Sequence, residues 1–82
     1  MESVYKFIEL IGVSTESWEK AAATAVERAS QTLRDIRIAE IEKLDMQLEN
    51  NVGYAALDIN RVVAYRAKVK ISFKVEKAVN DE

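Results

Sequence analysis

The last third of the chain alternates apolar and polar side chains over an unusually long stretch. Between residues 62 and 75 one parity is apolar, comprising Val63, Tyr65, Ala67, Val69, Ile71, Phe73 and Val75. From residue 66 onward the other parity is polar and mostly cationic, comprising Arg66, Lys68, Lys70, Ser72 and Lys74. Because strand side chains point alternately to opposite faces, this pattern predicts a long β-strand with one buried face.

A strand and a helix are predicted before it. Residues 4–11 are rich in β-branched and aromatic side chains, and Gly12 is expected to end this first strand. Ser14 is the predicted helix N-cap, with acidic residues in the turns after it. Residues 15–35 then carry one apolar stripe at helical spacing, made of Trp18, Ala21, Ala22, Ala25, Val26, Ala29 and Leu33. The many alanines would let this helix approach a sheet closely.

Residues 36–49 are predicted to form a second strand whose alternation breaks in the middle. Ile41 lies on one parity, and the later apolar residues Leu44, Met46 and Leu48 lie on the other. A β-bulge near Glu42 or Lys43 would return them to the same side. Alternatively, the two halves of the strand face different neighbours, namely the helix and a second subunit. Both interpretations predict a strand that bends.

The segment between the second and third strands is long for a hairpin connection. Asn50, Asn51 and Gly53 are typical turn residues, but hairpin loops usually have about 2–5 residues. The segment also contains Val52, Tyr54, Leu57 and Ile59. It is predicted either to pack on a neighbouring subunit or to display a recognition segment. The resulting order is β-α-β-β, an α+β fold.

Composition narrows the possible functions. The 82 residues suit one small domain, and the absence of cysteine and histidine argues against disulfides, zinc, copper and haem. The formal charge of −2 argues against nucleic acid as a partner. No apolar run reaches the roughly 20 residues of a membrane span, and the N-terminal residues do not resemble a signal peptide. A cytoplasmic protein with no membrane partner is expected.

One helix is too short and narrow to cover three strands of this length. Apolar side chains outside its reach would face solvent in a single chain, and long sheet edges favour pairing with other chains. Self-assembly is therefore predicted. The expected interface residues are Leu44, Met46, Leu48 and Tyr65.

The sequence resembles the dodecin family. The likeness lies in residues 4–12 (VYKFIELIG), 17–22 (SWEKAA), 33–35 (LRD) and 64–74 (AYRAKVKISFK). It implies a three-stranded antiparallel, bent sheet packed on one amphipathic helix, assembling into a hollow dodecamer. Residues 1–76 would form the single domain, with residues 51–60 an inserted hairpin tip, natural or engineered, and residues 77–82 a flexible tail. Dodecins commonly bind flavins in pairs between subunits and act as stores rather than catalysts.

The resemblance places two residues of this chain at the family's flavin site. Ile38 aligns with a tryptophan that stacks on the flavin ring, and Arg66 aligns with a glutamine that hydrogen-bonds the ring edge. Isoleucine has no aromatic face, and arginine offers only donors. Binding of riboflavin or flavin mononucleotide is therefore expected to be weak or absent. This chain more closely resembles a subgroup of dodecins that is associated with calcium. Members of that subgroup lack the tryptophan and the glutamine and carry a Tyr-Arg pattern like that of Tyr65 and Arg66.

The charged residues allow three predictions, namely a calcium site, attraction of phosphate groups, and ion pairs between strands. Calcium needs about 6–8 oxygen ligands, for which Asp45, Glu49 and Asp58 are the metal-ligand candidates, with Glu9 and Glu40 as further acids. No EF-hand loop occurs, so a site would gather carboxylates from several subunits. The cationic stripe either attracts phosphate groups or pairs with Glu9, Glu40 or Glu42 across strands.

No catalytic motif is recognisable, so an enzyme is not expected. Trp18 is predicted to anchor the core or an interface rather than to stack on a ligand. The sequence therefore favours a homo-oligomeric protein that binds or stores a small ligand. The alternative is a structural or calcium-stabilised shell, or an engineered scaffold, with no small-molecule role.

Overall fold

The computed structural model describes residues 2–52 and 58–75. Strand β1 (Tyr5–Ser14) is followed by helix α1 (Trp18–Ser30), strand β2 (Ile36–Val52) and strand β3 (Asp58–Lys74). The predicted β-α-β-β order is confirmed. Residues 53–57, with Gly53, Tyr54 and Leu57, lie outside the described residues, as does the tail from residue 77 onward.

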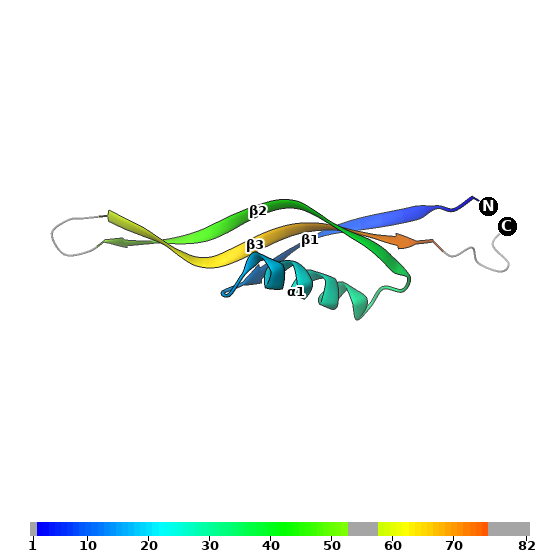
Figure 1. Cartoon of the computed structure of the whole chain (residues 1–82), viewed down its shortest axis with the longest axis horizontal. Coiled ribbons are helices and arrows are strands. Elements are labelled where there is room, and N and C mark those ends of the chain that lie inside the picture. Colours follow the sequence, from blue (N-terminus) through cyan, green and yellow to red (C-terminus); the bar gives the residue numbers. More distant parts are fainter. Residues whose placement is uncertain (1, 53–57, 76–82) are drawn as a thin grey trace.

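The three strands form one antiparallel sheet in which β3 lies between β1 and β2. Strand β1 pairs with residues 65–74 of β3, whereas β2 pairs with β3 along its whole length. Figure 1 shows the result as a long twisted ribbon, with α1 alongside its middle. The chain measures 69 × 19 × 18 Å along its principal axes. The helix therefore reaches only part of the sheet.

The predicted β-bulge in β2 is confirmed. Ile41 pairs with Val69 and Lys43 pairs with Lys68, so that Glu42 is the extra residue. After this bulge, Leu44 and Met46 lie opposite residues 67 and 65, on the same side of the sheet as Ile41. Two further register shifts occur between residues 36 and 38 and between residues 47 and 48. Such irregularities bend and twist a strand.

The helix is shorter than predicted, and Ser14 is not its N-cap. Ser17 has extended backbone angles, and its side chain accepts a hydrogen bond from the Lys20 N–H at 3.0 Å. Ser14 instead ends β1, and its Oγ accepts the Glu16 N–H at 2.9 Å. At the other end, Asp35 adopts a left-handed φ of 59° that turns the chain into β2. Two serines within four residues offered the same capping chemistry, and the length of β1 selected the second.

Gly12 does not end β1, because the strand continues through it and Gly12 pairs with Ala67. A Cβ at this position would overlap the carbonyl oxygen of Ala21. Glycine therefore permits the close contact between strand and helix. The alanine prediction is also confirmed, since the core consists of Ala21, Ala25, Ala29, Ala67, Val69 and Ile71.

The hairpin of β2 and β3 extends well beyond the end of β1. Asn50 pairs with Asn60, and Asn51 pairs with Ile59, so the prediction that Asn50 and Asn51 form a turn was wrong. The antiparallel ladder continues through them because each strand supplies backbone partners to the other. Residues 47–52 and 58–64, here called the hairpin arm, lie beyond the last pair between β1 and β3. The predictions that residues 51–60 are inserted and that the tail is flexible remain predictions.

Candidate functional site

Along β3, the two faces of the sheet carry different kinds of side chain. Residues directly opposite each other in an antiparallel pair point to the same side. The side that carries Ala67, Val69 and Ile71 is here called the helix face, because α1 packs on it over β1 and β3. The side that carries Arg66, Lys68 and Lys70 is here called the charged face. Candidate binding chemistry lies on both.

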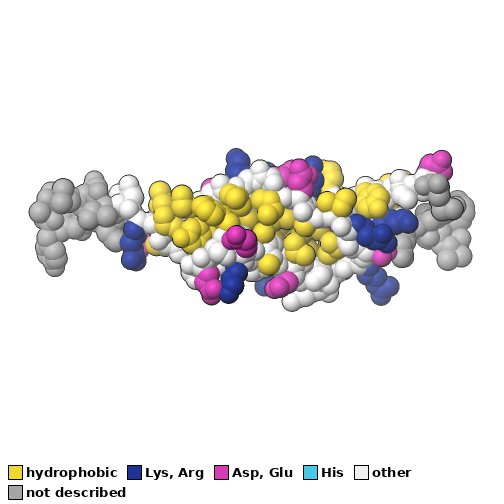
Figure 2. Space-filling view, in the orientation of Figure 1, with side chains coloured by type: hydrophobic (Ala, Val, Ile, Leu, Met, Phe, Trp, Pro, Cys, Tyr) yellow, Lys and Arg dark blue, Asp and Glu magenta, His cyan; other side chains and the backbone are white. Residues whose placement is uncertain are grey.

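The helix face is only partly covered, since α1 makes few contacts with β2. A row of apolar side chains on β2 is left in solvent, and this apolar row consists of Ile41 (51% exposed), Leu44 (47%), Met46 (45%) and Leu48 (57%). Figure 2 shows hydrophobic side chains gathered in a band along the strands beside the helix. Three of the four predicted interface residues therefore lie on an open surface of the single chain.

The fourth predicted interface residue, Tyr65, packs against Trp18. Their rings meet edge to face, with centroids 5.1 Å apart. The indole Nε1 of Trp18 also donates a hydrogen bond to the backbone carbonyl of Asp45 at 2.9 Å. Both contacts tie the start of α1 to the sheet, which agrees with the predicted role of Trp18 as an anchor. They also leave its ring engaged with protein groups.

On the charged face, the cations of β3 pair with acids on both neighbouring strands. Lys68 approaches Glu9 of β1 at 3.8 Å, and Lys70 approaches Glu42 of β2 at 3.6 Å. The predicted cross-strand pairing is thus confirmed for Glu9 and Glu42. Glu40 lies opposite Lys70 in register but forms no ion pair with any described residue.

Sequence reasoning missed the tightest of these pairs. Arg66 donates from Nε to Asp45 Oδ1 at 2.7 Å and from Nη2 to Oδ2 at 2.9 Å. This two-pronged geometry is the strongest form of carboxylate recognition by arginine. The β-bulge at Glu42 sets the register that brings Asp45 opposite Arg66. Counting strand partners across the predicted bulge would have found the pair.

The ion pair also shifts the proton affinities of both partners. The hydrogen bond from Arg66 lowers the pKa of the Asp45 carboxyl; desolvation partly opposes this shift, and the charges of Arg66 and Lys43 add to it. The hydrogen bond to Asp45 raises the pKa of Arg66. Both groups are therefore fully charged at neutral pH.

The two residues aligned with the flavin site lie apart within one chain. Ile38 is 57% exposed and lies beside Ser72, whereas Arg66 lies beside Asp45. The two positions are six residues apart along β3, which corresponds to roughly 20 Å of extended strand. The two positions therefore do not form one compact site within a single chain.

One aromatic residue on the charged face was not singled out from the sequence. Phe7 of β1 also lies opposite Ser72, on the far side of β3 from Ile38, and is 58% exposed. The amino group of Lys70 lies 4.5 Å from the centre of its ring. The alternation of β1, which places Tyr5 and Phe7 on the same parity, could have indicated from the sequence that both aromatic side chains lie on one face.

Two of the three metal-ligand candidates are engaged in ion pairs within the chain. Asp45 is held by Arg66, and Glu49 pairs with Arg61 at 3.0 Å. Asp58 is the first residue of β3, and its side chain lies outside the described residues. Across the part of the chain that the structure describes, no group of three or more acidic, histidine or cysteine residues could hold a metal ion. A calcium site built from the described residues would need carboxylates from several copies.

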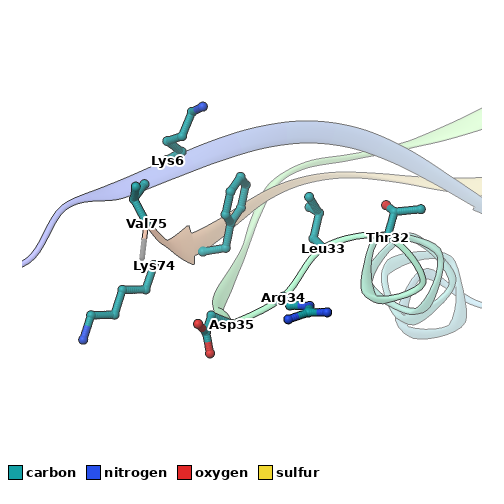
Figure 3. A pocket seen from close by; sticks show the side chains of 8 residues that line it. Lys6, Thr32, Leu33, Arg34, Asp35, Lys74 and Val75 are labelled. Carbon is teal, nitrogen blue, oxygen red and sulfur yellow. The ribbon is translucent and has the colours of Figure 1, made fainter. Parts of the chain in front are cut away.

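A shallow pocket of about 310 Å³ lies where α1 leads into β2. It is lined by Lys6, Thr32, Leu33, Arg34, Asp35, Phe73, Lys74 and Val75. Figure 3 shows that Lys6 and Lys74 extend in different directions, so the pocket does not concentrate positive charge.

No described helix is long and apolar enough to cross a membrane.

Comparison with known proteins identifies the family. The dodecin family model matches residues 4–76. A calcium dodecin from Mycobacterium tuberculosis is 43% identical over 76 residues, which cover 93% of this chain and 94% of that protein. A dodecin from Thermus thermophilus is 32% identical over 76 residues, which cover 93% and 97%.

Solved structures agree with this result. The dodecin from Streptomyces coelicolor superposes with a TM-score of 0.75 at 28% identity, covering 93% of this chain and 96% of that one. The crystal structure of the calcium-chelating M. tuberculosis dodecin gives a TM-score of 0.59 at 39% identity, with the same coverage. Dodecins are ligand-binding proteins, and assembly into a dodecamer is a property of the family.

Proposed function

Because this chain belongs to the dodecin family, we propose that it assembles into a dodecameric shell that binds and stores a small ligand between subunits. The observation that carries the proposal is the apolar row on β2. Its four side chains are about half exposed in the single chain. A contiguous exposed apolar surface of this kind typically marks a site where another protein binds.

The energetics support assembly through this row. Burying a large aliphatic side chain contributes roughly 1.5–3 kcal/mol. Covering the exposed halves of Ile41, Leu44, Met46 and Leu48 in a neighbouring subunit therefore stabilises each contact by several kcal/mol before ordering costs. Twelve copies repeat this contact, so a closed shell is favoured over the free chain.

Flavin is not the ligand that we propose. Ile38 presents no aromatic face for stacking, and the guanidinium of Arg66 is already held by Asp45. The exposed aromatic ring nearest in register, Phe7, is capped by Lys70. These features support weak or absent binding of riboflavin and flavin mononucleotide.

The second candidate function is a shell stabilised by calcium. It is favoured by the 43% identity to a protein named calcium dodecin. Hard divalent cations require several oxygen ligands. Asp45 and Glu49 are both neutralised by arginines within the chain, so a calcium site would have to combine further carboxylates across subunits. On this hypothesis the ion stabilises the shell.

Native mass spectrometry of the purified protein tests the proposal, with riboflavin fluorescence and calcium titrations on the same sample. We expect a twelve-subunit mass, no quenching of riboflavin fluorescence, and a mass increment from a small ligand or ion. A monomer or dimer would overturn the proposed assembly. Stoichiometric quenching would overturn the exclusion of flavin, and a shell unaffected by chelator would count against stabilisation by calcium.

A further inference from the structure

We infer that Asp45 is a specificity-determining residue, whose carboxylate occupies Arg66 and thereby excludes phosphate-bearing ligands from this part of the charged face. The inference rests on the proposed ligand-binding function and explains how the site selects against one class of ligand. Its central observation is the juxtaposition of two opposed residue pairs on β2 and β3, Lys43 with Lys68 and Asp45 with Arg66.

These four residues form a square on one face of the sheet. Lys43 and Asp45 are two residues apart on β2, and Lys68 and Arg66 are two residues apart on β3. Side chains opposite each other across strands lie about 5 Å apart at Cβ, and next-nearest neighbours along a strand lie about 7 Å apart. Three cations and a single carboxylate therefore lie together on one patch of the charged face.

Asp45 now fills the part of this square that an anion would take. Its two oxygens accept both hydrogen bonds of the Arg66 fork, at 2.7 and 2.9 Å. The guanidinium fork fits a phosphate as well as a carboxylate, but it cannot serve both at once. About 40% of each side chain is exposed, so a ligand reaches the pair directly from solvent.

The neighbouring cations are held far less firmly. Lys68 is 3.8 Å from its acidic partner Glu9, and Lys43 forms no ion pair within the described residues. Neutralising Asp45 would leave Arg66, Lys43 and Lys68 on one surface with no acid inside the square. Such a cluster of cations favours phosphate binding, with an affinity that falls as salt is added.

The structure offers a way to change this chemistry without disturbing the fold. Trp18 bonds to the backbone carbonyl of Asp45, not to its carboxylate. Asp45→Asn therefore keeps the anchor of α1 and removes only the charge. Glu49→Gln is a matched control, because it releases Arg61 from a similar ion pair farther along the same hairpin.

The experiment measures binding of riboflavin 5′-phosphate, riboflavin and inorganic phosphate to the assembled wild-type protein and both variants. We expect Asp45→Asn to bind riboflavin 5′-phosphate and inorganic phosphate at least about tenfold more tightly than wild type, since the released guanidinium can donate charge-assisted hydrogen bonds to phosphate. The gain should fall with added salt. Riboflavin should gain nothing, Glu49→Gln should behave as wild type, and Asp45→Asn combined with Arg66→Gln should lose the gain.

The outcomes separate this inference from the proposed function. Tight flavin binding by the wild type would refute the exclusion of flavin, whatever the variant does. An assembled Asp45→Asn protein that gains no phosphate affinity would overturn the inference alone, and an equal gain for riboflavin would also overturn it. Asp45→Ser provides a second variant. If neither variant assembles, the carboxylate is structural rather than selective, and the inference is wrong.

Discussion

The helix face and the charged face of this sheet are stabilised by different forces. The helix face buries Val69 and Ile71 completely beneath α1, and burial of each such side chain contributes roughly 1.5–3 kcal/mol. The charged face buries no charged group among the described residues. Its ion pairs are partly exposed, and pairs of this kind contribute about 0–1 kcal/mol each.

This difference separates folding from recognition. Substitutions on the covered part of the helix face should change whether the chain folds, and substitutions in its uncovered apolar row should change whether copies assemble. Substitutions of the charged residues on the charged face should leave both nearly intact and change what is bound. The sheet thus assigns stability and selectivity to opposite sides of the same three strands.

The largest expected effect comes from Gly12→Ala on the covered part of the helix face. The added Cβ would overlap the backbone carbonyl of Ala21, and a backbone group cannot move aside without displacing α1. We expect a loss of about 3 kcal/mol in the free energy of unfolding, or failure to fold. Urea unfolding followed by circular dichroism measures it.

Val13→Ala provides the control for this substitution. Val13 is the next residue of β1, points to the charged face and is 47% exposed. Its replacement should change stability by less than about 1 kcal/mol. Equal losses in the two variants would show that the contact between Gly12 and α1 does not set the stability of the fold.

Leu44→Asp is expected to change the stability of the single chain less, but to prevent assembly of the shell. Leu44 is already 47% exposed, so the single chain should keep its secondary structure. In the shell, the new carboxylate would be buried without a partner, which is strongly unfavourable. Native mass spectrometry should detect small species in place of the twelve-subunit shell.

Lys43→Gln is the matched control, because Lys43 is adjacent to Leu44 in β2 but points to the charged face. It should leave the subunit number unchanged. If Leu44→Asp still forms the full shell, the apolar row is not the interface, and the assembly must be held together by another surface.

The smallest expected effect is a dependence of stability on pH that arises from Asp45. Its pKa is lowered in the folded chain by the hydrogen bond from Arg66. Its stabilising contribution is therefore complete above the unfolded pKa of about 3.9 and is lost as the pH falls through the lower folded pKa. Urea unfolding between about pH 2 and 6 should show that the free energy of unfolding decreases less steeply with falling pH in Asp45→Asn than in wild type. The same slope in both proteins would exclude this contribution.

The elements and the family could be predicted from the sequence, because they depend on local patterns. Alternation over residues 62–75 indicated the central strand, and the apolar stripe from Trp18 onward indicated the helix. The broken alternation around Ile41 even indicated the bulge, which the pairing confirms at Glu42. Each of these signals is carried by residues close together in the chain.

The ends of the elements were predicted less well, because several residues offered the same local chemistry. Ser14 and Ser17 can both cap a helix, and Asn50 and Asn51 suit a turn as well as an exposed strand. The pairing of β3 with both neighbours decided each case. Gly12 does not end β1; it allows the close contact between this strand and the helix.

The sequence by itself determined the order of the elements, the amphipathic character of each and the lack of an aromatic residue at position 38. Only the tertiary structure decided which acid meets which base, that Ile38 and Arg66 lie far apart in one chain, and that α1 leaves the apolar row of β2 open. The physical reason is cross-strand register. One extra residue at Glu42 changes every later partner, and only the completed sheet fixes its consequences.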